Sequence, residues 1–193
     1  MSLILASNSQ IRRLMLDAAG VEFEIRSPCF DEESVKDGHD GDGEALARRL
    51  AEGKAQSIAA SASDWVIGSD STVMVDGIRY SKPRDRNEAA RHLRQFSDRT
   101  LLLSSAVALA NRGCVDWSRA ETAKLAVRKL SEDFIQSYLD LEWPDVGQCV
   151  GVFRMEGRGV NLFDRVDGSH FTILGMPLLP LLGALRDRGL VPA

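Results

Sequence analysis

Hydroxyl, basic and carboxylate side chains recur where predicted strands give way to turns and helices. The first set, Ser7, Ser9 and Arg12, follows a short apolar strand and opens a predicted helix. Amide groups at a helix N-terminus carry partial positive charge, and an arginine can bind a phosphate through two hydrogen bonds. We interpret this set as an anion site. The alternative is an ordinary capped helix whose arginines face solvent.

Two lysines are constrained by the backbone that carries them. Lys54 lies four residues from both Leu50 and Ile58, on the apolar stripe of a predicted helix. Because an isolated buried ammonium is costly, it must either extend to solvent or meet an anion. Lys82 precedes Pro83, which forces Lys82 into an extended backbone conformation. Both lysines are candidate phosphate ligands, and solvated side chains are the alternative.

Two carboxylates complete the candidate set. Asp70 follows Gly68 and Ser69, just beyond the predicted end of an apolar strand, where α/β proteins collect ligand chemistry. The alternative for Asp70 is a local turn between two strands. Glu32 lies in an acidic loop and is a candidate ligand for Mg²⁺ or Mn²⁺, although the adjacent Glu33 is equally placed. The alternative for this loop is a solvated acidic surface.

Together these groups suit a polyphosphate substrate that is bound with a divalent metal. The cations would bind the anion, the metal would neutralise developing negative charge, and a carboxylate would activate water. The chain has no GxxxxGK[ST] motif, so it is not a P-loop protein. Its three histidines share no zinc-binding spacing.

Helix and strand signals alternate along the chain and predict a mixed α/β or α+β fold. The predicted strands are 3–6, 21–27, 65–69, 72–75, 100–111 and 114–130, with further strand signals over 151–166. The predicted helices are 10–19, 44–62, 86–96, 131–141 and 177–189, and residues 30–42 are predicted to form a loop. Asp76-Gly77 is a hairpin signal. No repeat or linker divides the sequence, so we predict one domain over residues 1–193.

Composition limits the functional classes. The 193 residues are 44% hydrophobic and 27% charged, which is ordinary for a globular domain. A net charge of −4 argues against a broadly basic nucleic-acid binder. We expect no membrane span, because the longest apolar run, 173–185, is short and interrupted. Three widely separated cysteines and the absence of an export signal indicate a reducing cytoplasm.

Several short motifs, in one order, resemble the Maf family of nucleoside triphosphate pyrophosphatases. They are Leu3-Ile4-Leu5-Ala6-Ser7-x-Ser9-x-x-Arg12-Arg13, Asp31-Glu32, Arg48-Arg49-Leu50-Ala51-x-x-Lys54-Ala55, Gly68-x-Asp70, Lys82-Pro83, Glu156-Gly157-x-Gly159, and Gly168 followed by Leu174-Gly175-Met176-Pro177-Leu178. The resemblance runs from Leu3 to about Gly189.

The resemblance implies a cytoplasmic, metal-dependent enzyme that cleaves a nucleotide between its α and β phosphates. The implied fold is an elongated mixed sheet with flanking helices and a cleft between two lobes, similar to inosine triphosphate pyrophosphatases. The implied roles match those suggested above. Asp70 would be the general base or the carboxylate that positions metal and water, Glu32 would be a metal ligand, and Ser7, Ser9, Arg12, Lys54 and Lys82 would bind the substrate.

Three positions where the family's branches differ concern the base. In the family that the chain resembles, the thymidine/uridine branch has Arg at the position of Ile11, and the 7-methyl-GTP branch has Trp there. Ser71 stands where these branches have Thr and Gln, whereas Glu156 matches the 7-methyl-GTP branch. A carboxylate can accept from the N1–H and the exocyclic amine of guanine.

The sequence therefore favours 7-methyl-GTP as substrate. One alternative is a dTTP/UTP pyrophosphatase of the same family, and another is a non-catalytic nucleotide-binding regulator of septum formation. The expected partner is a small nucleotide, with no nucleic acid or membrane. A homodimer is the alternative to a monomer.

Overall fold

A computed structural model describes residues 2–39 and 42–192 of the chain. Its strands are β1 (Leu3–Ala6), β2 (Glu24–Ile25), β3 (Trp65–Val75), β4 (Ile78–Tyr80), β5 (Thr100–Asn111), β6 (Cys114–Val127) and β7 (Phe163–Asp167). Its α-helices are α1 (Gln10–Ala18), α2 (Glu32–Asp37), α3 (Gly43–Gln56), α4 (Arg86–Phe96), α5 (Glu132–Glu142), α6 (His170–Leu174) and α7 (Leu178–Asp187). Two 3₁₀ turns cover Asp145–Gln148 and Arg158–Leu162.

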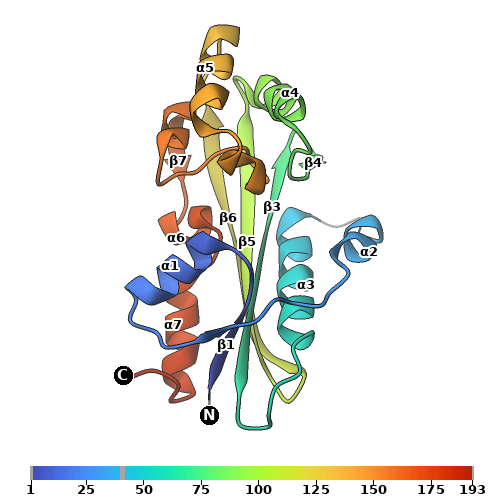
Figure 1. Cartoon of the computed structure of the whole chain (residues 1–193), viewed down its shortest axis with the longest axis vertical. Helices are drawn as coiled ribbons and strands as arrows, with labels where there is room; N and C mark the ends of the chain where they lie inside the picture. Colours follow the sequence, from blue (N-terminus) through green and yellow to red (C-terminus); the bar gives the residue numbers. More distant parts are fainter. Residues whose placement is uncertain (1, 40–41, 193) are drawn as a thin grey trace.

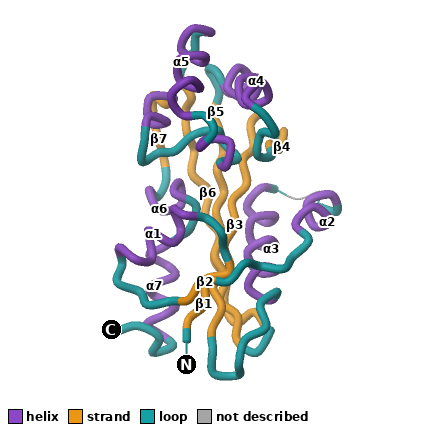
Figure 2. Tube along the Cα trace, in the orientation of Figure 1, coloured by secondary structure: helices purple, strands orange, loops and turns teal. Residues whose placement is uncertain are grey.

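Within the described residues, the strands form one mixed sheet in the order β2-β1-β3-β5-β6-β7, with β4 also on β3. The long strands β3, β5 and β6 run along the length of the molecule (Figure 1). The helices α4 and α5 lie at one end of these strands, and α1, α3 and α7 flank the other end (Figures 1 and 2). This confirms the mixed α/β fold predicted from the alternation of elements.

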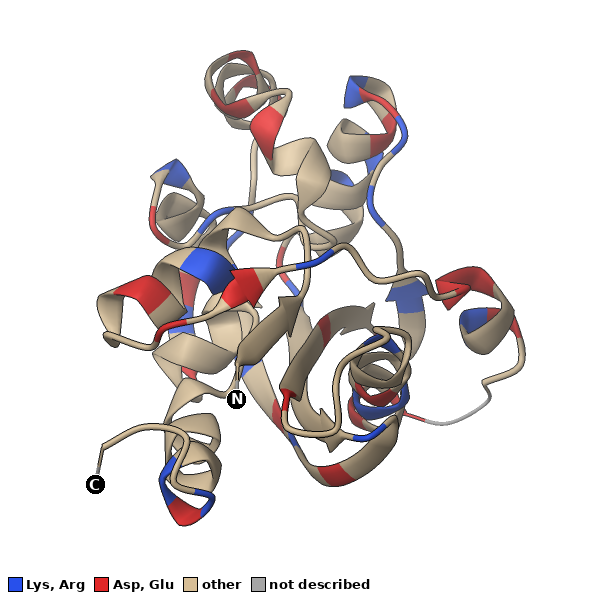
Figure 3. Cartoon of the chain, turned by 60° about the horizontal axis from the view of Figure 1, so that its bottom comes forward, with Lys and Arg blue, Asp and Glu red and all other residues tan. Residues whose placement is uncertain are grey.

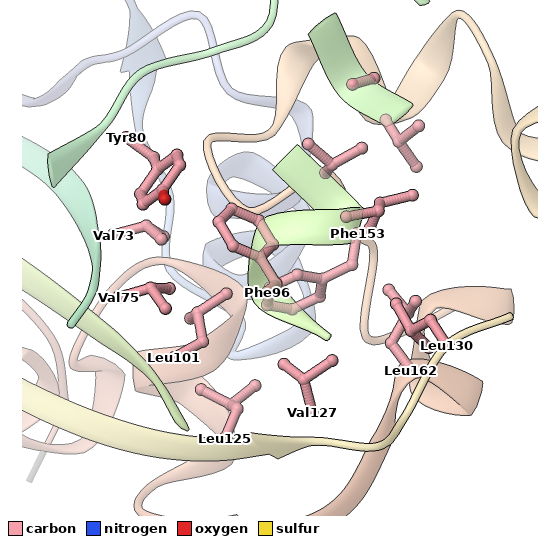
Figure 4. Packing of buried hydrophobic residues seen from close by; sticks show 14 of the residues in the cluster. Val73, Val75, Tyr80, Phe96, Leu101, Leu125, Val127, Leu130, Phe153 and Leu162 are labelled. Carbon is pink, nitrogen blue, oxygen red and sulfur yellow. The ribbon is translucent and has the colours of Figure 1, made fainter. Parts of the chain in front are cut away.

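Apolar side chains form separate clusters at the two ends of the sheet. At the α4–α5 end, Phe96, Leu101 and Leu125 are fully buried, and Tyr80 packs edge-on against Phe96 (Figure 4). At the other end, one cluster lies under α7 and a second, rich in alanine, lies under α3. The long strands β3 and β5 contribute residues to all three clusters, so no loop separates one cluster from the next.

One edge of β3 is interrupted. β5 pairs with every residue of β3. On the opposite edge, the pairing of β3 with β1 ends at Gly68, and its pairing with β4 begins only at Val73. The backbone of residues 69–72 therefore has no strand neighbour on that edge. The gap adjoins the carboxyl end of the parallel strand β1, which is the kind of position where α/β sheets bind ligands.

The prediction that Asp70 lies beyond a strand end is wrong. β3 is continuous from Trp65 to Val75, and Asp70 is near its middle. The polar residues at 69–71 resemble a turn in sequence, but pairing with β5 holds them extended. The open edge that a strand end would offer to a ligand is provided instead by the gap between the pairings of β3 with β1 and with β4.

Residues 30–42 are not all loop, because they contain the short helix α2. Asp31 caps this helix by accepting from the amide of Ser34, and Lys36 pairs with both Glu32 and Glu33 one turn earlier. Capping and ion pairs of this kind stabilise a helix without an apolar stripe. The absence of hydrophobic periodicity explains why the sequence did not predict it.

Other boundaries also differ from the prediction. The strand expected over 21–27 is reduced to Glu24–Ile25, and the helix expected to reach residue 62 ends at Gln56. The strand signals of 151–166 give mainly a 3₁₀ turn and the edge strand β7. Each segment is at an edge or an end, where few neighbours impose regular structure.

Helix α6 was not predicted at all.

Within residues 2–39 and 42–192, no helix has both the length and the apolar composition that crossing a membrane requires.

Candidate active site

The guanidinium group of Arg12 enters the gap in the edge of β3. Nε donates to the carbonyl of Gly175 at 2.9 Å, and Nη1 donates to the carbonyl of Ser69 at 2.9 Å. Nη2 donates to the hydroxyl of Ser71 at 3.0 Å and lies 3.9 Å from Asp70 Oδ1. Arg12 thus satisfies a backbone carbonyl that a neighbouring strand would otherwise satisfy.

Burial of Arg12 lowers its pKa, although Asp70 and Glu32 oppose the effect. The sequence alternative, an arginine facing solvent, is therefore wrong, because the residue is only 8% exposed. All three nitrogens already donate to protein oxygens. Arg12 joins α1, β3 and the turn after α6 at one point.

Lys54 lies between two carboxylates. Its Nζ is 2.9 Å from Asp70 Oδ2 and 2.8 Å from Glu32 Oε1. Lys54 is 7% exposed, so its ammonium meets anions rather than extending to solvent. We name Arg12, Glu32, Lys54 and Asp70 the ion-pair cluster. In formal charge it is balanced, with two cations and two anions.

Gly68 allows Lys54 to reach Asp70. A Cβ at Gly68 would lie 2.1 Å from the carbonyl oxygen of Ala51 and 2.5 Å from the amide nitrogen of Ala55. Only glycine permits the backbone of α3 to lie this close to β3. Because Asp70 is two residues further along the strand, its side chain is on the same face as α3.

Helix α2 brings Glu32 to the cluster. The ring of Phe30 packs on α3 at Gly53, where a Cβ would lie 2.2 Å from the ring. Arg79 donates to the carbonyl of Lys36 at 2.9 Å and holds the other end of α2. Figure 3 shows α2 beside α3, with acidic and basic positions together. Glu32 therefore points inward, whereas the side chain of Glu33 is 75% exposed.

Lys82 and Glu156 lie in segments that pack at the α4–α5 end of the sheet, away from the mid-strand gap. Lys82 is exposed and borders a hollow of about 310 Å³ with Tyr80, Arg84 and His92. A second hollow of about 440 Å³ is lined by residues of α2, α3 and β4, and Arg79 borders both. Neither described lining includes Arg12, Lys54 or Asp70. The hollows therefore adjoin the ion-pair cluster through α2 and β4 rather than containing it.

The pKa of the Cys149 thiol is affected by burial and by Glu156 and Lys82. Burial raises the pKa of the Cys149 thiol to about 11; Glu156 adds to the increase and Lys82 opposes it. Glu156 is exposed, and within the described part of the chain it has no hydrogen bond or ion pair.

The remaining predicted site residues occupy varied positions. The hydroxyl of Ser7 is buried and accepts from the amide of Ser9 at 3.2 Å, while Ser9 begins α1 without a side-chain cap. Ser71 bonds Arg12, Ser105 and Gly175, on the face of β3 opposite Asp70. Ile11 is half-buried on α1, a helix that packs in the cluster under α7, whereas Val152 and Phe153 before Glu156 pack in the α4–α5 cluster.

Sequence reasoning missed residues that fix this geometry. Ser69 donates to Ala106 and Gly175, and Ser105 donates to the carbonyl of Thr172 at 2.7 Å. Gly175 ends α6 with a φ of +111°, which favours glycine, and turns its carbonyl toward Arg12. Serines inside apolar strands were the available signal, because a buried hydroxyl requires a partner.

The sequence matches a described family over residues 2–188, under the name Maf-like protein. The chain belongs to the Maf-like family. This confirms the resemblance carried by the short motifs. Those motifs include Gly68-x-Asp70, Lys54 and Arg12, which the structure brings together.

Curated members of the family are similar over nearly their whole length. A protein named 7-methyl-GTP pyrophosphatase from Rhizobium meliloti is 43% identical, covering 99% of this chain and 98% of that protein. A protein named nucleoside triphosphate pyrophosphatase from Sphingopyxis alaskensis is 44% identical and covers both chains completely. A solved dITP/XTP pyrophosphatase from Mycobacterium abscessus has a TM-score of 0.41 at 19% identity, covering 67% of this chain and 76% of its own.

Proposed function

We propose that this Maf-like protein hydrolyses a nucleoside triphosphate between its α and β phosphates, releasing a nucleoside monophosphate and pyrophosphate. The observation that carries the proposal is the ion-pair cluster at the gap in β3, which is largely buried except at Glu32. A carboxylate pair and a lysine converge there beside the N-terminus of α1. The names of curated relatives support the same reaction class.

A divalent metal would be held by Asp70 and Glu32. Within the described residues, no three acidic, histidine or cysteine side chains converge, but Mg²⁺ commonly binds one or two carboxylates together with substrate phosphates. Asp70 Oδ2 suits this role, because it is buried and makes an ion pair but no aligned hydrogen bond. When bound, the metal would neutralise charge on the phosphates and lower the pKa of bound water.

Charge balance supports a role for a divalent metal. The ion-pair cluster is neutral in formal charge, so by itself it has little attraction for a polyphosphate. A divalent cation on Asp70 and Glu32 would make the site positive and free Lys54 to face the phosphates. Lys82 would then supply a second ammonium from the loop after β4. Arg12 would hold Asp70 in place through Ser69, Ser71 and Gly175.

The base preference that we propose is for 7-methyl-GTP, and it depends on Glu156. Glu156 is exposed and has the hydrogen-bonding polarity that a guanine edge requires. Its negative charge also favours the cationic ring of a 7-methylated guanine. A dTTP/UTP preference is the alternative, and a relative whose name states no particular base is equally similar.

A pyrophosphate-release assay tests the proposal. The protein, treated with a chelator and then supplied with Mg²⁺ or Mn²⁺, is given 7-methyl-GTP, GTP, UTP and dTTP in turn. We expect equimolar monophosphate and pyrophosphate only with metal, with the highest kcat/KM on 7-methyl-GTP. Release of single orthophosphate, or no turnover of any nucleotide, would reject the reaction, whereas a different substrate ranking would reject only the base preference.

A further inference from the structure

Glu142 is a buried carboxylate that the proposed reaction does not use. It is the last residue of α5, and its side chain is 1% exposed. Its Oε2 is 3.0 Å from Arg154 Nη2 and its Oε1 is 3.2 Å from Arg158 Nη1. A charge in this position is costly unless it is paired, so its two partners account for its presence.

The two arginines flank Glu156. Arg154 is two residues before Glu156 and Arg158 is two residues after it, so one buried carboxylate holds both sides of this turn. Arg154 also pairs with Asp145 at 3.0 Å. We name residues 149–159 the Glu156 segment.

The backbone of the Glu156 segment is shaped around these pairs. A Cβ at Gly159 would lie 2.5 Å from the carbonyl oxygen of Arg154, so a glycine is required for the chain to fold back here. Val152 and Phe153 anchor the start of the segment in the apolar cluster at the α4–α5 end. Glu156 is thus an exposed carboxylate without an ion-pair partner among residues 2–39 and 42–192, and Glu142 holds the segment on both sides of it.

We propose that Glu142 is a positioning residue for nucleotide selectivity, holding Arg154 and Arg158 so that Glu156 faces the base of the substrate. This inference rests on the proposed function. Glu142 is buried under the segment and does not touch substrate. Its loss should therefore affect discrimination between bases more than the chemistry at the phosphates.

The test compares Glu142→Gln and Arg158→Gln with Glu132→Gln. Glu132 is a matched control, because it is also on α5 and binds Arg94 through two hydrogen bonds, but at the surface. In the parent chain and each variant, kcat and KM are measured for 7-methyl-GTP and UTP. For Glu142→Gln we expect the ratio of the two kcat/KM values to change by about tenfold or more, mainly through KM. Glu132→Gln should keep the parental ratio.

A purely structural role would give a different result. If Glu142→Gln and Arg158→Gln lowered kcat/KM on both nucleotides by the same factor, or kept the parental ratio, the inference would be overturned. If Glu142→Gln does not fold, Arg158→Gln decides alone, since the side chain of Arg158 is 61% exposed and its replacement should not unfold the chain.

A second measurement does not depend on activity. Cys149 begins the Glu156 segment and is half-buried, whereas Cys114 is exposed at the start of β6. We expect Glu142→Gln to raise the rate at which iodoacetamide labels Cys149 by about tenfold, through local opening, with no change at Cys114. An unchanged Cys149 rate would overturn the inference. If the parent chain cleaves no nucleotide, the proposed function fails, and this labelling rate still decides whether Glu142 holds the segment.

Discussion

The two oxygens of Asp70 have different partners. Oδ1 accepts from the amide of Ser71 at 2.8 Å, and Oδ2 pairs with Lys54. An asparagine has the same shape and can keep the first contact, but it lacks the charge that pairs with Lys54 and would bind a metal. Asp70 therefore permits a test that separates chemistry from folding.

We expect Asp70→Asn to lower kcat by about 10²-fold or more, because the variant loses the carboxylate that we propose binds metal or activates water. The melting temperature and kcat are measured together on the same preparation. The control is Asp76→Asn, which removes a surface pair with Arg99 remote from the gap. Activity of Asp70→Asn within a factor of two of the parent would contradict the assigned role.

Glu156→Gln should shift preference from 7-methyl-GTP and GTP toward UTP and dTTP. A carboxylate only accepts hydrogen bonds, whereas an amide can both accept and donate, as the edge of a pyrimidine requires. A mismatched polar group costs about 1–3 kcal/mol, so relative kcat/KM should change by about tenfold or more. The four nucleotides are assayed side by side. An unchanged ranking would show that Glu156 does not face the base.

At the scale of elements, α3 is the helix that aligns the site with the sheet. Its alanines and Gly68 let the two backbones approach, and this approach places Lys54 beside Asp70. A polar contact, from Thr72 to the carbonyl of Gly43 at 2.8 Å, fixes the start of the helix. The geometry of the ion-pair cluster therefore depends on a residue that has no functional group.

Gly68→Ala should displace α3, lower stability by about 1–3 kcal/mol and reduce activity by more than the loss of folded protein explains. Urea denaturation and kcat/KM measure the two effects. Gly183→Ala is the matched control, because its Cβ in α7 would approach only Arg186, at 4.0 Å. That change should stabilise the helix by about 0.5–1 kcal/mol. Equal behaviour of the two variants would refute the proposed role of Gly68.

Helix α2 permits a comparison of neighbouring residues. Glu32→Gln should raise the Mn²⁺ concentration needed for half-maximal activity by about tenfold, because it removes one of the two proposed metal ligands. Glu33→Gln should change it by less than about twofold, since Glu33 pairs only with Lys36 at the surface. Metal titrations of both variants decide the matter. Equal shifts would reject Glu32 as the ligand.

At the scale of the whole molecule, the two ends of the sheet are joined by long continuous strands. β5 pairs with both β3 and β6 from the alanine-rich end to the cluster around Phe96. This common frame holds Lys82 and Glu156 toward the α4–α5 end and the ion-pair cluster at the gap near the middle of β3. The helix α2 and the strand β4 connect them through Arg79.

The shared strands predict one cooperative unfolding transition rather than one for each end. The calorimetric enthalpy should equal the van't Hoff enthalpy and be about 0.7 kcal/mol per residue near 60 °C. Differential scanning calorimetry measures both. Two resolved transitions would show that the ends unfold independently, which would contradict the prediction of a single domain over residues 1–193.

Much of the fold could be predicted because its signals are local. The helix over 86–96 has the predicted bounds, and the pair of long strands joined at Arg112-Gly113 is confirmed. The order of short motifs was also sufficient to indicate the family, because a motif is a property of neighbouring residues. Elements without periodicity, such as α2 and α6, could not be predicted in this way.

The sequence by itself determined which chemical groups are available, their order along the chain, and the Maf-like family. Only the tertiary structure decided their partners, because these come from distant parts of the chain. Arg12 donates to the carbonyl of Gly175, which is 163 residues away in the sequence. Lys54 pairs with Glu32 rather than Glu33, because the orientation of α2 turns Glu32 toward it. Asp70 lies in the gap because the pairing of β3 with β1 ends before it and the pairing with β4 begins after it. Such choices depend on packing between elements, which no local pattern encodes.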